Sequence, residues 1–61
     1  MSNRCLGLTH VEAHFLLSQN GYHVVGSRLT PSVVFIEYKR KDSVIILMLS
    51  TDLVVREVVE D

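Results

Sequence analysis

A run of six apolar residues, residues 44–49, is the clearest feature in the pattern of apolar and polar positions along this chain. Successive side chains of a β-strand point to opposite faces, so a strand that is wet on one side alternates between apolar and polar residues. This run does not alternate, and it therefore predicts a strand with apolar side chains on both faces. The one evident helix can cover only one of them. We expect a loop, a terminal segment or a second molecule to cover the other.

Residues 10–19 are predicted to form that helix. Thr9 and Glu12 have the spacing of a capping box, in which each side chain accepts a hydrogen bond from the backbone N–H of the other residue. Asn20 and Gly21 mark the end of the helix, because glycine most easily adopts the left-handed conformation of a C-terminal cap.

The predicted helix has two apolar sides. One side carries Leu8, Val11 and Phe15, and the side broadly opposite carries Ala13, Leu16 and Leu17. A sheet can bury only one of these sides. We therefore expect either Val11 and Phe15 or Leu16 and Leu17 to contact another molecule.

Residues 33–40 and 43–49 predict a β-hairpin that turns at Lys41 and Asp42. Pairing Arg40 with Ser43 gives one face that is entirely apolar, with Val34, Ile36, Tyr38, Ile45, Leu47 and Leu49. The same register gives a mixed face, with an apolar patch and a charged end, that carries Phe35, Glu37, Lys39, Val44, Ile46 and Met48. We assign the first face to the core and the second to an interface.

The remaining segments complete the expected fold. Residues 22–29 predict a strand, and residues 30–32, which include a proline, predict the connection after it. Residues 1–7 show no periodicity and are expected to form a flexible arm. The chain as a whole is predicted to be a single small α+β domain, in which one N-terminal helix packs on an antiparallel three-stranded meander.

The C-terminal segment, residues 53–60, allows two interpretations. A short helix capped by Asp52 would gather Val54, Val55, Val58 and Val59 on one side. A fourth strand is the alternative, because valine is β-branched and residues 50–52 have turn-forming side chains. We favour the helix slightly, since it separates apolar from charged residues more cleanly.

Composition indicates self-association. A chain of 61 residues buries only about 60% of the surface that its unfolded form exposes, yet 48% of its residues are hydrophobic. Its single cysteine, Cys5, excludes an internal disulfide, and no Cys/His set suits a structural zinc. A homodimer is therefore predicted. The second subunit, or a protein partner, is expected to contact the following residues: Val11, Phe15, Leu16, Leu17, Phe35, Val44, Ile46 and Met48.

Charge and hydropathy give no sign of a membrane or a polyanion as the main partner. The net charge is −1, and the longest apolar run is far below the roughly 20 residues of a membrane-spanning helix. The N-terminus lacks the apolar core of a signal peptide. We expect a cytoplasmic protein in which Cys5 is reduced.

Catalytic and metal-binding patterns are weak. His10 and His14 are four residues apart, which lets two imidazoles approach one metal ion, but no third ligand lies nearby and Glu12 is misplaced for a zinc protease. Cys5 falls in the expected arm, where a rigid catalytic arrangement is hard to hold. We predict that the protein is not an enzyme and needs neither a metal nor a cofactor.

One basic cluster supports an alternative function. Lys39, Arg40 and Lys41 lie at the expected hairpin tip, where they more often keep the turn solvated than bind a ligand. If Arg28 approaches from the neighbouring strand and Tyr38 stacks on a base, the tip suits nucleic acid.

The order of the predicted elements also resembles a known family. A helix, a Gly-Tyr pair at residues 21–22, a three-stranded meander and a short final helix are similar to the small double-stranded-RNA-binding-like fold of the HicA toxin family. In that family a Gly-Ser-His motif carries the histidine of an RNase site. Here the Gly-Ser pair at residues 26–27 is followed by Arg28, and His23 precedes the pair. The resemblance implies the fold, and the RNase motif lacks its histidine.

These observations together predict a small, non-catalytic protein-interaction module that binds, inhibits or regulates another protein, and that acts as a homodimer. Binding of nucleic acid at the basic tip is the first alternative. A small HicA-like RNase is the second.

Overall fold

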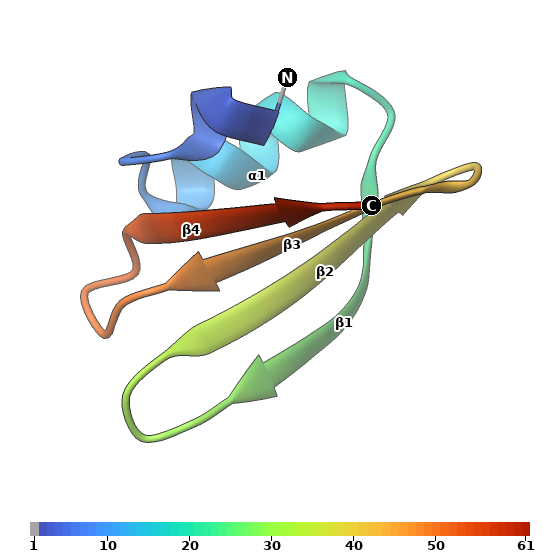
Figure 1. The fold of residues 1–61 in the computed structure, drawn as a ribbon. Coiled ribbons are helices and arrows are strands. Elements are labelled where there is room, and N and C mark those ends of the chain that lie inside the picture. The colour runs from blue at the N-terminus through green and yellow to red at the C-terminus, as the bar shows by residue number, and fades with distance from the viewer. Residues whose placement is uncertain (1) are drawn as a thin grey trace.

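The computed structural model describes residues 2–61 as two helices and a four-stranded antiparallel sheet (Figure 1). The elements are the 3-10 helix η1 (Ser2–Cys5), α1 (His10–Gln19), β1 (His23–Leu29), β2 (Val34–Arg40), β3 (Ser43–Leu49) and β4 (Val55–Glu60). The strand order is β1-β2-β3-β4, so every strand pairs with its neighbours in sequence. The predicted α+β class is confirmed, and its meander is extended by a fourth strand.

The predicted capping box sets the start of α1. Thr9 is the N-cap: its hydroxyl accepts a hydrogen bond from the N–H of Glu12 at 3.3 Å, and its own N–H donates to Oε1 of Glu12 at 3.0 Å. Asn20 ends the helix, and Gly21 follows with a φ of 85°, in the left-handed region that favours glycine. The helix has the predicted bounds because its end signals are local.

The β2–β3 hairpin has the predicted register. Arg40 pairs with Ser43 across the two-residue turn, and Lys41 in that turn has a positive φ of 53°. Ile36 pairs with Leu47 as a consequence, and the whole predicted apolar face points to the core. The buried hydrophobic residues are Cys5, Ala13, Leu17, Tyr22, Ile36, Tyr38, Ile45, Leu47, Leu49 and Val55.

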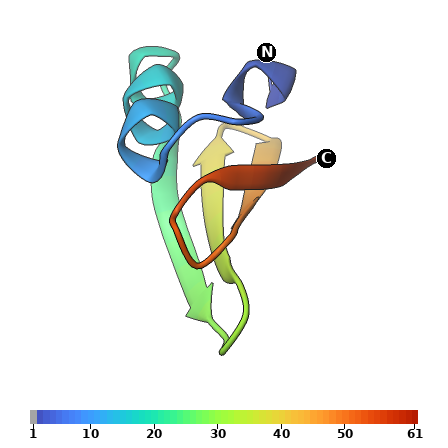
Figure 2. The same ribbon diagram turned by 90° about the vertical axis from the view of Figure 1, so that its left-hand side faces the viewer.

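The sheet is covered on one face. Figure 2 shows α1 and η1 side by side on the same side of the sheet. We call the sheet face under these helices the inner face and the opposite one the outer face. Within residues 2–61, no element covers the outer face.

The N-terminal segment differs from the expected flexible arm. Residues 2–5 form η1, and the side chain of Cys5 is fully buried. The N–H of Gly7 donates to the carbonyl of Val55 at 2.9 Å, and the N–H of Val55 donates to the carbonyl of Leu8 at 2.8 Å. A ten-residue helix is too small to cover four strands, so this segment completes the layer. Met1 lies outside the described residues.

The preference for a C-terminal helix was wrong, because residues 55–60 form β4. Met48 pairs with Glu57 and Leu49 pairs with Val55, so the register shifts by one residue here. This irregularity turns both Val55 and Val58 towards the core although they are three residues apart, and that spacing imitates a helix. The β-branched valines suit the strand.

Asp52 belongs to the turn before β4 and does not cap a helix. Its carboxylate accepts a hydrogen bond from the hydroxyl of Ser50 and lies 3.3 Å from Nη2 of Arg56. Leu53 closes the turn with a φ of 62°. The alternative interpretation of residues 50–52 as a hairpin turn is therefore confirmed.

We predict that Leu47→Ala lowers the free energy of unfolding by about 2–5 kcal/mol, since Leu47 is fully buried on a central strand and its truncation leaves a cavity. Urea denaturation at fixed protein concentration measures this. Val11→Ala, at a side chain that is 72% exposed, is the control and is expected to change stability by less than about 0.5 kcal/mol. Equal losses in the two variants would contradict the assignment of the core.

We predict that the Glu12 carboxylate, which accepts the hydrogen bond from the N–H of Thr9 in the capping box, contributes to stability only when it is ionised. Hydrogen bonds from the backbone N–H and the hydroxyl of Thr9 hold the pKa of Glu12 below its ordinary value. The stabilisation is therefore present above the ordinary pKa of a glutamate side chain and is lost as the pH falls through the lowered pKa of Glu12. The melting temperatures of the wild type and Glu12→Gln should differ at neutral pH and converge in acid. A difference that persists in acid would show that the charge is not responsible.

Candidate interaction surface

The outer face of the sheet has an apolar centre. The register places Phe35 beside Met48 on β2 and β3, and Ile46 beside Val59 on β3 and β4. Phe35, Ile46 and Met48 are partly buried by their neighbours, as is Val44, and Val59 is 51% exposed. The four sheet residues predicted for an interface thus lie together on the uncovered face.

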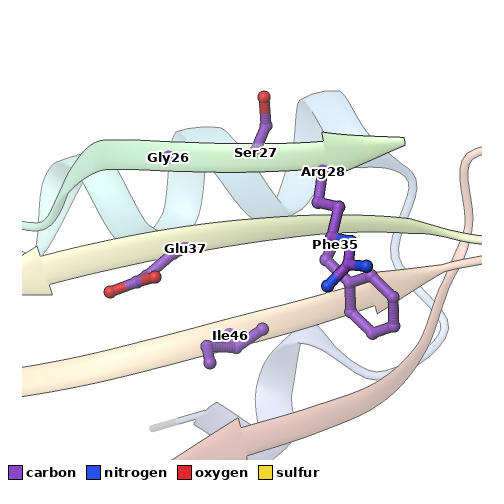
Figure 3. A pocket seen from close by; sticks show the side chains of 6 residues that line it. All are labelled: Gly26, Ser27, Arg28, Phe35, Glu37 and Ile46. Carbon is purple, nitrogen blue, oxygen red and sulfur yellow. The ribbon is translucent and has the colours of Figure 1, made fainter. Parts of the chain in front are cut away.

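A shallow depression of about 410 Å³ opens on this face beside the edge strand β1 (Figure 3). Its lining consists of Gly26, Ser27, Arg28, Phe35, Glu37 and Ile46. Gly26 pairs with Glu37 in the ladder, and a Cβ atom built at Gly26 would meet no heavy atom within 4 Å. The hollow therefore lies where β1 lacks a side chain, and Arg28 and Glu37 supply opposite charges around it.

The structure decides between the two apolar sides of the helix. Ala13 and Leu17 are fully buried against the sheet, and Leu16 is partly buried beside them. Val11 and Phe15 remain 72% and 64% exposed. The prediction of Leu17 as an interface residue was wrong, because the side of α1 that carries it is the one that packs on the core.

The predicted nucleic-acid contacts do not come together at the hairpin tip. Tyr38 is fully buried and cannot stack on a base, because its side chain points to the inner face. Arg28 lies near the far end of β1, so it does not approach the tip. Lys39, Arg40 and Lys41 are all exposed and remain the basic residues of the tip.

Arg40 has a structural role at this tip. Its Nη1 atom donates a hydrogen bond to the carbonyl of Asn20 at 2.8 Å, and its guanidinium lies 4.6 Å from the centre of the Tyr22 ring. A cation over an aromatic face is attracted by the ring quadrupole. Arg40 thus connects the tip to the end of α1.

A polar cluster lies between α1 and the sheet, but it lacks an activated group. Nδ1 of His14 is 2.9 Å from the hydroxyl of Tyr38, and Nε2 is 3.4 Å from Oγ of Ser18. Burial raises the pKa of Tyr38, and the nearby Cys5 raises it further. Burial also raises the pKa of the Cys5 thiol. Both groups are held in their protonated forms, whereas a nucleophile needs the opposite shift.

The histidine pair has no third ligand. The ring centres of His10 and His14 are 6.2 Å apart, and no group of three or more His, Cys, Asp or Glu residues in the described range 2–61 is arranged to hold a metal ion. The same part of the chain contains no helix long and apolar enough to cross a membrane.

One exposed surface was missed by the sequence analysis. Val24, Val25 and Leu29 on β1 are all exposed, and the sequence analysis assigned none of them to an interface. The available signal was topological: the first strand of a meander is an edge strand, and the helix before it leaves the far end of the strand uncovered.

We predict that native Cys5 reacts slowly with thiol reagents, because its side chain is fully buried and burial raises its thiol pKa. Labelling should be slow under native conditions and complete within the mixing time in urea, as followed by absorbance. Fast labelling of the folded protein would show an accessible thiolate and would reopen the question of nucleophilic chemistry.

Comparison with known proteins identifies no relative: no family model, no curated protein and no solved structure matches this chain. The likeness to the HicA toxin family thus stays a resemblance in the order of elements. At the C-terminus the chain has β4 where the resemblance implies a helix.

Proposed function

We propose that this protein is a non-catalytic interaction module that associates with itself and binds another protein through the outer face of its sheet. The observation that supports this function is the apolar centre formed by Phe35, Ile46, Met48 and Val59 on a face that no other element of residues 2–61 covers. Uncovered apolar patches rimmed by charges are typical of protein interfaces. Glu37, Lys39 and Glu57 supply such a rim.

The chemistry of the chain favours a binding role over a catalytic one. The depression on the outer face offers the charged side chains of Arg28 and Glu37. Ser27 pairs with the inner-face residue Ile36, so its hydroxyl points away from the depression. The buried Cys5 and Tyr38 are held protonated and point away from this face. Function therefore depends on surface shape and apolar area.

Nucleic acid is a weaker alternative. The net charge of −1 gives no long-range attraction to phosphate. Of the residues considered for such contacts, Tyr38 is buried and Arg40 is engaged with Asn20 and Tyr22. Lys39 and Lys41 alone provide few phosphate contacts.

Affinity purification from the native cell with three baits tests the proposed function. We predict that a partner protein is retained by the wild type, released by Ile46→Glu, and retained by Leu53→Glu. Ile46 lies at the centre of the outer face, whereas Leu53 is an exposed apolar residue of the β3–β4 turn and is the matched control. Circular dichroism checks that both variants fold.

Two results would contradict the proposal. A partner retained equally by Ile46→Glu would exclude the outer face, and a wild type that sediments at micromolar concentration only as a 6.9 kDa species would exclude self-association. Salt-dependent binding of duplex DNA would establish the alternative, if the salt slope flattens by about 0.9 for each phosphate ion pair that Lys39→Ala/Lys41→Ala removes.

A further inference from the structure

One edge of strand β1 has no neighbouring strand within residues 2–61. Among the strands of residues 2–61, β1 pairs only with β2, and it lies at the border of the sheet (Figure 1). The other edge strand, β4, is partly covered at its start by the backbone of Gly7 and Leu8, and it carries three charged residues, Arg56, Glu57 and Glu60. β1 has a single such residue, Arg28. An open edge with little charge is the part of a sheet most ready to pair with another strand.

The unpaired backbone groups of β1 can be assigned from its ladder. The N–H of Thr30 donates to the carbonyl of Val33 at 3.0 Å, so this pair is hydrogen-bonded. Bonded and non-bonded pairs alternate along an antiparallel ladder. Arg28 is thus bonded to β2, while the N–H and C=O groups of Ser27 and Leu29 point to the open edge.

Two exposed apolar side chains of β1 share one face. Val24 pairs with Tyr38 and Leu29 pairs with Val34, and both partners belong to the inner face of β2. A register irregularity between Val24 and Gly26 makes this arrangement possible, because residues five apart in a regular strand lie on opposite faces. Val24 is 46% exposed and Leu29 is 79% exposed.

We propose that β1 pairs antiparallel with β1 of a second copy about a twofold axis at Ser27, so that two four-stranded sheets become one continuous sheet. In this register the outward backbone groups of Ser27 bond to those of Ser27 in the second copy, and Arg28 lies opposite Gly26. Val24 and Gly26 occupy successive positions of the ladder, because Val25 has no partner of its own at the register shift. Val24 therefore lies opposite Leu29 of the second copy. The twofold axis gives the unpaired backbone groups of both β1 edges hydrogen-bond partners in one closed dimer. This inference rests on the self-association contained in the proposed function.

Charge complementarity selects this register. Arg28 of the second copy lies over Gly26, where no side chain obstructs it, and next to Glu37, the ladder partner of Gly26. Its guanidinium thereby enters the depression on the outer face and pairs with the Glu37 carboxylate, and the twofold axis repeats the ion pair. Neither the Arg28 nor the Glu37 side chain has a hydrogen bond or ion pair within residues 2–61. Figure 3 shows these side chains extending in different directions.

The neighbouring registers are less favourable. An axis at Arg28 brings two arginines opposite each other, which is destabilising. An axis at Gly26 places the apolar Val24 opposite the polar Ser27 of the second copy. The axis at Ser27 alone joins apolar to apolar and positive to negative. It also sets the two outer faces side by side, which doubles the apolar surface offered to a protein partner.

Cysteine cross-linking tests the register. A disulfide needs Cα atoms about 4.4–6.8 Å apart, and directly opposite hydrogen-bonded residues are about 5.5 Å apart. Oxidation of folded Ser27→Cys should therefore give a covalent dimer on a non-reducing gel. Leu29→Cys is the matched control, because in this register the two Leu29 residues lie at opposite ends of the strand pair, so it should not cross-link. The wild type controls for the buried Cys5.

Charge exchange tests the ion pair independently. Arg28→Glu and Glu37→Arg should each raise the dimer Kd about tenfold or more, because each places like charges together twice. The double variant Arg28→Glu/Glu37→Arg should restore dimerisation, as measured by sedimentation equilibrium. Circular dichroism of each variant checks its fold.

The outcomes separate this inference from the proposed function. A dimer that Ser27→Cys does not cross-link, or in which the double variant does not recover, would overturn the β1 pairing and leave self-association intact. A monomeric wild type would overturn both. The role of the outer face in binding a partner is judged separately by the Ile46→Glu bait.

Discussion

The two-residue turn at Lys41 and Asp42 is the constraint on which the rest of the structure depends. It pairs Arg40 with Ser43, and the period of two along each strand then assigns every side chain of β2 and β3 to a face. A slip of one residue would exchange the inner set, with Leu47 and Tyr38, for the outer set, with Ile46 and Glu37. The position of the core, the outer apolar patch and the hollow beside β1 all follow from this register.

Two separate elements, α1 and η1, form the layer that covers the inner face of the sheet. α1 alone leaves part of the inner face uncovered, and η1 places the fully buried Cys5 over the remainder. The layer also buries a hydroxyl, that of Tyr38, which is partnered by His14 at 2.9 Å. An unpartnered buried hydroxyl would cost on the order of 1–3 kcal/mol, a large fraction of the stability of a small domain. Partnering this hydroxyl is therefore a structural role for His14.

The asymmetry of the sheet connects the fold to the proposed function. One face is covered by the chain, while the other has an apolar centre that we propose binds a partner, and the β1 edge has backbone groups that we propose pair with a second copy. Small domains gain little stability from their own cores, so oligomerisation is a common form of support. In this protein the same association would enlarge the surface available for recognition.

The sequence by itself determined the local features: the capping box that starts α1, the glycine that ends it, the β2–β3 register, and a central strand that is apolar on both faces. Each depends on residues close together in the chain. Only the tertiary structure decided that Leu17 faces the core and Phe15 does not, that residues 2–5 fold against β4, and that residues 55–60 form a strand. These outcomes depend on contacts between distant segments and on a register shift at β4 that makes a strand resemble a helix in its spacing. The periodicity of a sequence shows neither these contacts nor the register shift, because it describes one element at a time.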